Sequence, residues 1–181
     1  MKKLFTLLSL ISFSLTSVYS QNWQWAHEGQ YSAADNEALG TSISNTGDVF
    51  VCGYYQTQFS LGGNSLTSLY QGDNNSFIAK YNSAGTVQWL RNVDGVQPDA
   101  NSAMVVSSDT LGNCYVVSGN GYVSSTAGSL LNYASSYGGF HEVKKINAVG
   151  ADVWTFTPSF NVNSGCTFES IKTDKSGNVN A

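Results

Sequence analysis

The stretch SNTGDVFVCG at residues 44–53 decides the fold, because related stretches occur twice more in the chain. They read DTLGNCYVVSG at residues 109–119 and DKSGNVNA at residues 174–181. In each, a Gly followed by Asp or Asn lies just before a strand-like run, which is typical of a tight hairpin turn. Because Gly47, Gly112 and Gly177 are evenly spaced, the sequence indicates a repeat of about 65 residues.

Three further residue types keep nearly the same spacing. They are Trp25, Trp89 and Trp154, Lys80 and Lys145, and Gly85 and Gly150. Since Trp, Lys and Gly have unrelated chemistry, one shared register supports repeat units at about residues 28–92, 93–157 and 158–181, the third of them truncated. A Trp that recurs at one position predicts packing between units, and Trp23 is the one Trp outside this register.

Each complete unit is predicted to contain four strands. In the first unit they span about 41–44, 49–55, 76–82 and 86–92, and in the second about 104–108, 114–119, 141–147 and 152–157. The stretch NWQWAH at 22–27 is similar to a fourth strand with no three strands before it. Apolar residues persist in the Gly/Ser/Asn-rich inserts at 56–75 and 120–139, so we expect a small extra hairpin in each insert.

The second strand of each unit is apolar at almost every position, as in VFVC at 49–52 and CYVV at 114–117. Such a strand is buried on both faces, and we expect it to be the most buried strand of its unit. No helical periodicity follows residue 20, so the covering layers must be other sheets. The sequence therefore predicts an all-β fold, a β-propeller-like stack of four-stranded antiparallel blades with about two and a half blades present. A β-helix or solenoid is the alternative, although its coils are usually shorter.

The first twenty residues have the composition of a secretory signal peptide. MKK supplies positive charge, LFTLLSLISFSL is an apolar core too short for a membrane span, and small residues precede Gln21. The predicted mature chain, 21–181, forms the repeat domain. It has 8 − 2 = 6 Lys and Arg against 12 Asp and Glu, a net charge of −6. This balance argues against nucleic acid or an anionic membrane as a partner.

The motifs match those of a known family. DTLGNCYVVSG, NSFIAKYNSAG at 75–85 and TVQWLRNVDG at 86–95 resemble the SBBP β-propeller repeat of exported bacterial proteins, and FSLGGNSLTS at 59–68 is similar to that family's insert. His141, Glu142, Lys144 and Asn180 depart from the pattern. Together with the leader, the resemblance is to exported proteins of Bacteroidetes. It implies a surface or secreted scaffold and carries no catalytic residues to transfer.

Few residues form a pattern associated with catalysis or metal binding. Cys52, Cys114 and Cys166 match no zinc spacing, and a disulfide between any two stays open. His27 and His141 occupy unrelated repeat positions. Carboxylates at related connections between units, Asp35, Glu37 and Asp99, suggest a rim contact with calcium or sugar, with solvated turns as the alternative. DKSGN at 174–178 lacks the acids of a calcium loop. We predict no catalytic residue, metal ligand or cofactor.

These observations predict an exported, non-catalytic propeller scaffold at the cell surface or outside the cell, which binds a carbohydrate or protein. The alternative is the propeller part of a polysaccharide-active enzyme whose catalytic residues lie outside residues 1–181. A ring of blades needs about four to eight of them, so we also expect residues 1–181 to be the front of a longer protein.

Overall fold

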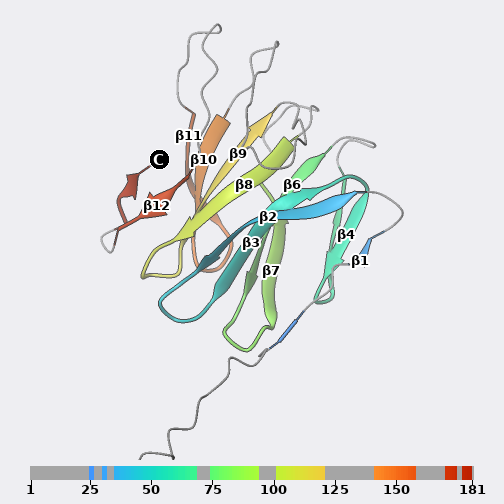
Figure 1. The fold of residues 1–181 in the computed structure, drawn as a ribbon, viewed down its shortest axis with the longest axis horizontal. Helices are drawn as coiled ribbons and strands as arrows, with labels where there is room; N and C mark the ends of the chain where they lie inside the picture. The colour runs from blue at the N-terminus through green and yellow to red at the C-terminus, as the bar shows by residue number, and fades with distance from the viewer. Residues whose placement is uncertain are drawn as a thin grey trace, which may run out of the picture.

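Antiparallel β-strands form the regular structure of this protein (Figure 1). The computed structural model describes residues 25–26, 30–31, 35–68, 74–93, 101–120, 141–157, 170–174 and 177–180. None of these residues is helical, which confirms the prediction of an all-β fold. Within the same ranges, no helix is long and apolar enough to cross a membrane. The predicted signal peptide lies outside the described residues.

Two four-stranded sheets have the same topology. The first has the order β2 (Asn36–Ile43), β3 (Val49–Tyr55), β6 (Asn75–Tyr81) and β7 (Val87–Asn92). The second has the order β8 (Asn101–Ser108), β9 (Cys114–Asn120), β10 (His141–Ile146) and β11 (Asp152–Phe156). All neighbours in both sheets are antiparallel. The prediction of one four-stranded antiparallel sheet for each complete repeat is therefore confirmed.

The first strand of each sheet is longer than predicted. A β-bulge interrupts β2 between Ala38 and Gly40, and another interrupts β8 between Ala103 and Val105. A bulge breaks the two-residue alternation of side chains, so pattern reading ends the strand there although pairing continues beyond it. The bulge also brings backbone close to Gly53, where an added Cβ would lie 1.9 Å from the carbonyl oxygen of Glu37.

The first insert contains the predicted hairpin. Its strands, β4 (Gln58–Leu61) and β5 (Asn64–Thr67), pair with each other, and β1 (Gln30–Tyr31) joins β4 to make a small three-stranded sheet. The second insert lies outside the described residues. The predicted strand at 22–27 is wrong at Trp25 and Ala26, which belong to no strand and pair with no described strand. The Trp25 ring packs on Tyr81 of the first sheet. The rest of that stretch is not among the described residues.

The turns of the repeat share one hydrogen-bonded frame of five residues. The backbone N–H of the first residue donates to the carbonyl of the fifth, and a Gly with positive φ occupies the fourth position. Positive φ favours Gly because it has no Cβ. An Asn, Asp or Ser at the first position also accepts backbone hydrogen bonds within the turn. The first residues are Ser44, Asn82, Asp109, Asn147 and Asp174.

The two large sheets pack face to face around one apolar cluster. From the first sheet come Phe50, Cys52, Ile78 and Val93, and from the second come Val106, Cys114, Val116 and Ile146. Trp89 packs against the cluster from β7. Each fully buried aliphatic or aromatic side chain of this kind contributes about 1.5–3 kcal/mol relative to an exposed one. This contact between repeats is therefore a major source of stability.

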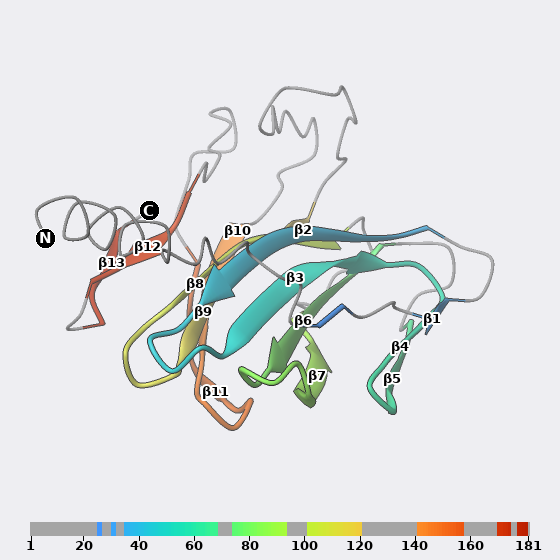
Figure 2. The ribbon, with the colours of Figure 1, turned by 60° about the horizontal axis from the view of Figure 1, so that its bottom comes forward.

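A second cluster repeats the first one unit later. It joins Tyr115, Val117 and Val143 to Ile171, with Val179 partly buried against it. Each of these lies one repeat length after a member of the first cluster. Ile171 precedes β12 (Lys172–Thr173), which pairs with β13 (Val179–Asn180) and lies beside β8 (Figure 2). These two short strands begin a third layer.

The most buried strand of the first sheet is β6 and not the predicted β3. Every residue of β6 is buried, whereas Val49 and Val51 of β3 are half-buried. β6 is buried more completely because Trp25 and the hairpin residues Phe59 and Leu61 pack on the face of the first sheet that points away from the second sheet, in one cluster with β6 side chains. Val49 and Val51 are only partly buried against this cluster. In the second sheet the prediction is accurate, since the residues from Cys114 to Val117 are all buried.

Candidate functional site

The predicted rim carboxylates lie at the start of β2. Asp35 and Glu37 are both exposed, and Asp99 is not among the described residues. Glu37 lies opposite Tyr54 in the β2–β3 ladder, and the Tyr54 hydroxyl donates a hydrogen bond of 3.0 Å to Glu37 Oε2. Desolvation, followed by this hydrogen bond and the nearby negative charge, raises the pKa of Tyr54. Tyr54 therefore stays neutral at physiological pH and keeps a hydroxyl beside a carboxylate on the surface.

Asn36 lies between these two acids but on the other face of the sheet, because side chains alternate along a strand. Both polar atoms of its amide are buried and have no hydrogen-bond partner among the described residues. Asn36 and Glu37 therefore cannot contribute to one ligand shell. The rim offers one carboxylate–phenol pair, which suits hydrogen bonding to hydroxyl groups better than coordination of a metal ion.

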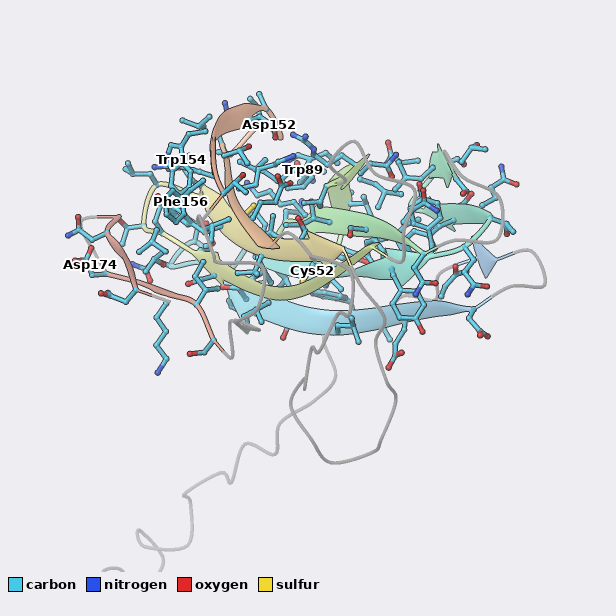
Figure 3. All side chains as sticks on the ribbon, turned by 90° about the horizontal axis from the view of Figure 1, so that it is seen from above. Cys52, Trp89, Asp152, Trp154, Phe156 and Asp174 are labelled. Atoms are coloured by element: carbon cyan, nitrogen blue, oxygen red, sulfur yellow. The ribbon has the colours of Figure 1, made fainter. Side chains whose placement is uncertain are left out.

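The two described cysteines are free thiols in the core between the sheets. Desolvation is the main cause that raises the pKa of Cys52 and of Cys114 to about 12 each. Nucleophilic and metal-binding cysteines react as thiolates, which these two groups do not form near neutral pH. Cys166 lies outside the described residues. Figure 3 shows Cys52 inside the stack of strands.

The described residues contain no group of three or more His, Cys, Asp and Glu side chains close enough to hold a metal ion. His141 begins β10 and pairs through its backbone with Gly119, and His27 is not among the described residues. Asp174, from DKSGN, caps its own turn through hydrogen bonds to the backbone and side-chain amides of Asn178. This is the hairpin-turn role that the repeat predicts for it.

Asp109 is a buried carboxylate whose sequence context indicates only a repeated hairpin turn. Its Oδ1 accepts hydrogen bonds from the backbone N–H groups of Leu111 and Asn113, at 2.9 and 3.0 Å. Its Oδ2 accepts from the Asn113 amide at 2.7 Å and from the Tyr115 hydroxyl at 3.1 Å. Burial by itself raises the pKa of Asp109, but these hydrogen bonds outweigh burial and lower it. All these partners belong to the protein, so the role of Asp109 is structural.

Lys144, which interrupts the apolar pattern expected of its strand, is also satisfied internally. It is only 8% exposed and faces the first sheet, where its Nζ donates to the Val93 carbonyl at 3.1 Å. It also forms an ion pair of 3.4 Å with Glu142. The two charged residues that replace apolar ones in β10 therefore form a pair, and Lys144 ties the second sheet to the end of β7.

An apolar surface on β11 is the second candidate site. Trp154 is 38% exposed and Phe156 is 56% exposed, and Figure 3 shows the two near each other. The Trp154 ring also contacts Tyr115, with ring centroids 5.9 Å apart. The spacing of the Trp residues predicts that Trp154 packs between units; Trp154 is partly exposed in this structure, and its packing between units stays a prediction. Spacing identified the position correctly, but no described segment covers it.

The chain matches no family model, and it matches no curated protein.

Proposed function

We propose that this chain is a secreted or cell-surface, non-catalytic β-propeller scaffold that acts as a binding or adhesion module. The observation that carries the proposal is the recurrence of one sheet-to-sheet interface, one repeat further along the chain. Repetition of the same head-to-tail contact turns each sheet by a similar step relative to the one before, and such contacts generate rings when the rotation closes. Four-stranded sheets arranged around an axis are the architecture of a propeller.

Polar pairs reinforce the same step at both interfaces. Ser42 Oγ and Ser108 Oγ lie 2.9 Å apart, and Ser107 Oγ and Thr173 Oγ1 lie 3.0 Å apart. In both pairs the partners are 66 residues apart, on the first strands of neighbouring units. Equivalent strands are therefore held in equivalent positions, which supports a constant rotation between units.

The binding role is proposed for the rim where β2 begins. Loops that join one sheet to the next lie at a propeller's rim, and functional residues are common on loops held by a rigid scaffold. The Glu37–Tyr54 pair offers a carboxylate and a neutral phenol at an exposed position. Paired acceptor and donor groups of this kind suit the hydroxyl groups of a carbohydrate or of a glycoprotein.

Binding of the full chain to immobilised polysaccharides and glycoproteins tests this role. We expect saturable binding to at least one of them and a weaker affinity after Glu37→Gln or Tyr54→Phe. Ser65→Ala, on the exposed β5 strand of the hairpin, is the matched control and should bind like the unchanged chain. A chain that binds none of these surfaces, while its far-UV spectrum shows folded β-structure, would refute the proposed role.

Export is tested separately by the N-terminus of the protein that cells produce. The proposed signal peptide should be removed before Gln21, so mass spectrometry of protein from the culture medium or cell surface should detect a chain that starts there. A product that remains inside the cell with residues 1–20 attached contradicts export.

A further inference from the structure

Trp25 joins the N-terminal segment to the first sheet without strand pairing. It belongs to no described strand, and its ring stacks on Tyr81 of β6 with ring centroids 5.3 Å apart. The ring also packs against the apolar cluster that contains the hairpin residues Phe59 and Leu61. One side chain therefore links this segment to the sheet and to the cluster beneath the hairpin.

Gly85 makes room for this ring. It lies in the turn between β6 and β7 with a φ of +82°, and an added Cβ would lie 2.5 Å from the Trp25 indole. We call this space the Gly85 slot, and Figure 1 shows the Trp25 segment beside the turn. A similar contact joins the two large sheets, where Trp89 lies against Gly150 and an added Cβ would be 3.2 Å from the ring. This chain therefore uses a Trp on a glycine turn to hold separate layers together.

The ring in the Gly85 slot closes one side of an apolar cluster. Tyr81 of β6 and Val87 and Leu90 of β7 belong to the same cluster or pack against it. Burial raises the pKa of Tyr81, as expected for a phenol that Trp25 covers. Departure of the ring would expose this side of the cluster to water. Because burial of one large apolar side chain shifts a local opening equilibrium by about tenfold or more, the hairpin would open more often.

Trp25 also lies close in sequence to the predicted signal peptide. It follows Ser20 by 25 − 20 = 5 positions. Five residues span at most about 17 Å when fully extended, so a leader held at a membrane keeps Trp25 within that distance of the lipid. Indole rings favour the interface between lipid and water. The Trp25 ring therefore has two competing positions, the membrane interface and the Gly85 slot.

We propose that Trp25 is a switch residue that couples removal of the leader to closure of the first sheet. In a membrane-held chain that retains residues 1–20, the ring lies at the lipid interface and the Gly85 slot is empty. In the chain that starts at Gln21, the ring occupies the slot and holds the hairpin on the sheet. The inference rests on the signal peptide of the proposed function and adds a conformational step that follows its removal.

Hydrogen exchange of the hairpin amides tests the switch on two forms of the chain. One form retains residues 1–20 and is bound to phosphatidylcholine vesicles, and the other form starts at Gln21. Zwitterionic lipid avoids repulsion of a chain that carries a net charge of −6 after residue 20. Mass spectrometry measures exchange over residues 58–67, which include β4 and β5. We expect these amides to exchange about tenfold more slowly in the form that starts at Gln21.

Trp25→Ala separates the two states. In the form that starts at Gln21, this change should speed exchange of the hairpin amides about tenfold, because the slot loses its ring. In the vesicle-bound form it should leave the rate unchanged, since the ring is already outside the slot. Leu111→Ala is the matched control, because Leu111 is 79% exposed on a turn of the second sheet, and it should leave hairpin exchange unchanged in both forms. Should Trp25→Ala not fold, Trp25→Phe gives the same order with a smaller ratio.

Three results would overturn the proposal. The first is equal hairpin exchange in the two unsubstituted forms, or a leader-bearing chain that does not bind the vesicles at all. The second is an equal effect of Trp25→Ala in both forms, because the ring would then occupy the slot whether or not the leader is held. The third is no effect of Trp25→Ala in either form. Polysaccharide binding and the N-terminus of the protein made by cells are measured separately, so failure of the switch leaves the proposed function standing.

Discussion

Replacement of Asp109 tests whether a buried turn residue supports both repeats that meet beside it. Asp109→Ala removes four hydrogen bonds to a carboxylate whose side chain is only 2% exposed. The Tyr115 hydroxyl then keeps its contact across the layers, to the Gly177 carbonyl at 3.2 Å, but loses its partner within the turn. Hydrogen bonds to charged groups contribute about 1.5–3 kcal/mol each but overlap strongly within one turn. We expect the free energy of unfolding to fall by about 2–4 kcal/mol.

The matched control is Asp174→Ala, one repeat later. Asp174 makes the same contacts to Asn178 but is exposed, so water replaces them and we expect a loss below about 1 kcal/mol. Urea unfolding followed by tryptophan fluorescence measures both losses. Equal losses for the two variants, or a loss below about 0.5 kcal/mol for Asp109→Ala, would contradict the reasoning, since burial would then add nothing to the turn.

The same residue predicts a dependence on pH. The pKa of Asp109 is lower in the folded protein than in the unfolded chain, so the ionised carboxylate stabilises the fold. The advantage of the unchanged chain over Asp109→Ala should be complete above about pH 5 and should shrink as the pH falls through the lowered pKa. If the difference between the two unfolding free energies does not change as the pH is lowered into the acid range, the carboxylate charge is not the stabilising feature.

Three further predictions use the same unfolding assay or a thiol reagent. Gly63→Ala, with φ +81° and open space, should lose about 1–2 kcal/mol from the left-handed backbone alone. Gly85→Ala, with φ +82° and a Cβ that would collide with Trp25, should lose at least about 1 kcal/mol more than Gly63→Ala. Equal losses would mean that Trp25 does not lie against Gly85. Lys144→Ala should lower the free energy of unfolding by about 1–3 kcal/mol, because the Val93 carbonyl and Glu142 each lose their contact with Lys144. Lys144→Met should recover part of that loss through packing. An unchanged stability of Lys144→Ala would show that this contact between the sheets does not stabilise the fold. Cys52 and Cys114, each with a pKa of about 12, should resist alkylation by iodoacetamide at mildly alkaline pH in the folded chain and should react in urea. Rapid alkylation of both thiols in the folded chain would contradict their burial between the sheets.

Much of the fold follows from local sequence. Gly-Asp and Gly-Asn turns, apolar runs and a register shared between the repeats predicted the four strands of each sheet, and β3 spans the predicted residues 49–55 without error. Turn chemistry involves neighbouring residues only, so sequence carries it directly. The bulges in β2 and β8 escaped prediction because they depend on how the partner strand is paired.

The candidate sites depended more on packing. The positions of Asp35 and Glu37 between units predicted them at the rim, but the pairing of Glu37 with Tyr54 could not be predicted, because Tyr54 lies opposite Glu37 only after the β2–β3 ladder forms. Spacing predicted Trp154 at an interface between units, but only the structure shows that the described residues leave its side chain partly exposed. The burial of Asp109 could not be predicted from its turn motif, because the same motif at Asp174 is exposed.

The sequence by itself determined the turns and the strand order, because each follows from a short local pattern of turn residues and apolar runs, and it determined the period, because that pattern recurs at a spacing of about 65 residues. Tertiary structure decided which copy of a repeated residue is buried and which is open. Trp89 and Trp154 occupy the same position in their units, yet a glycine turn of the next sheet meets Trp89 and no described turn meets Trp154. Burial depends on the neighbouring sheet, whose position follows from contacts made 59 to 68 residues away along the chain.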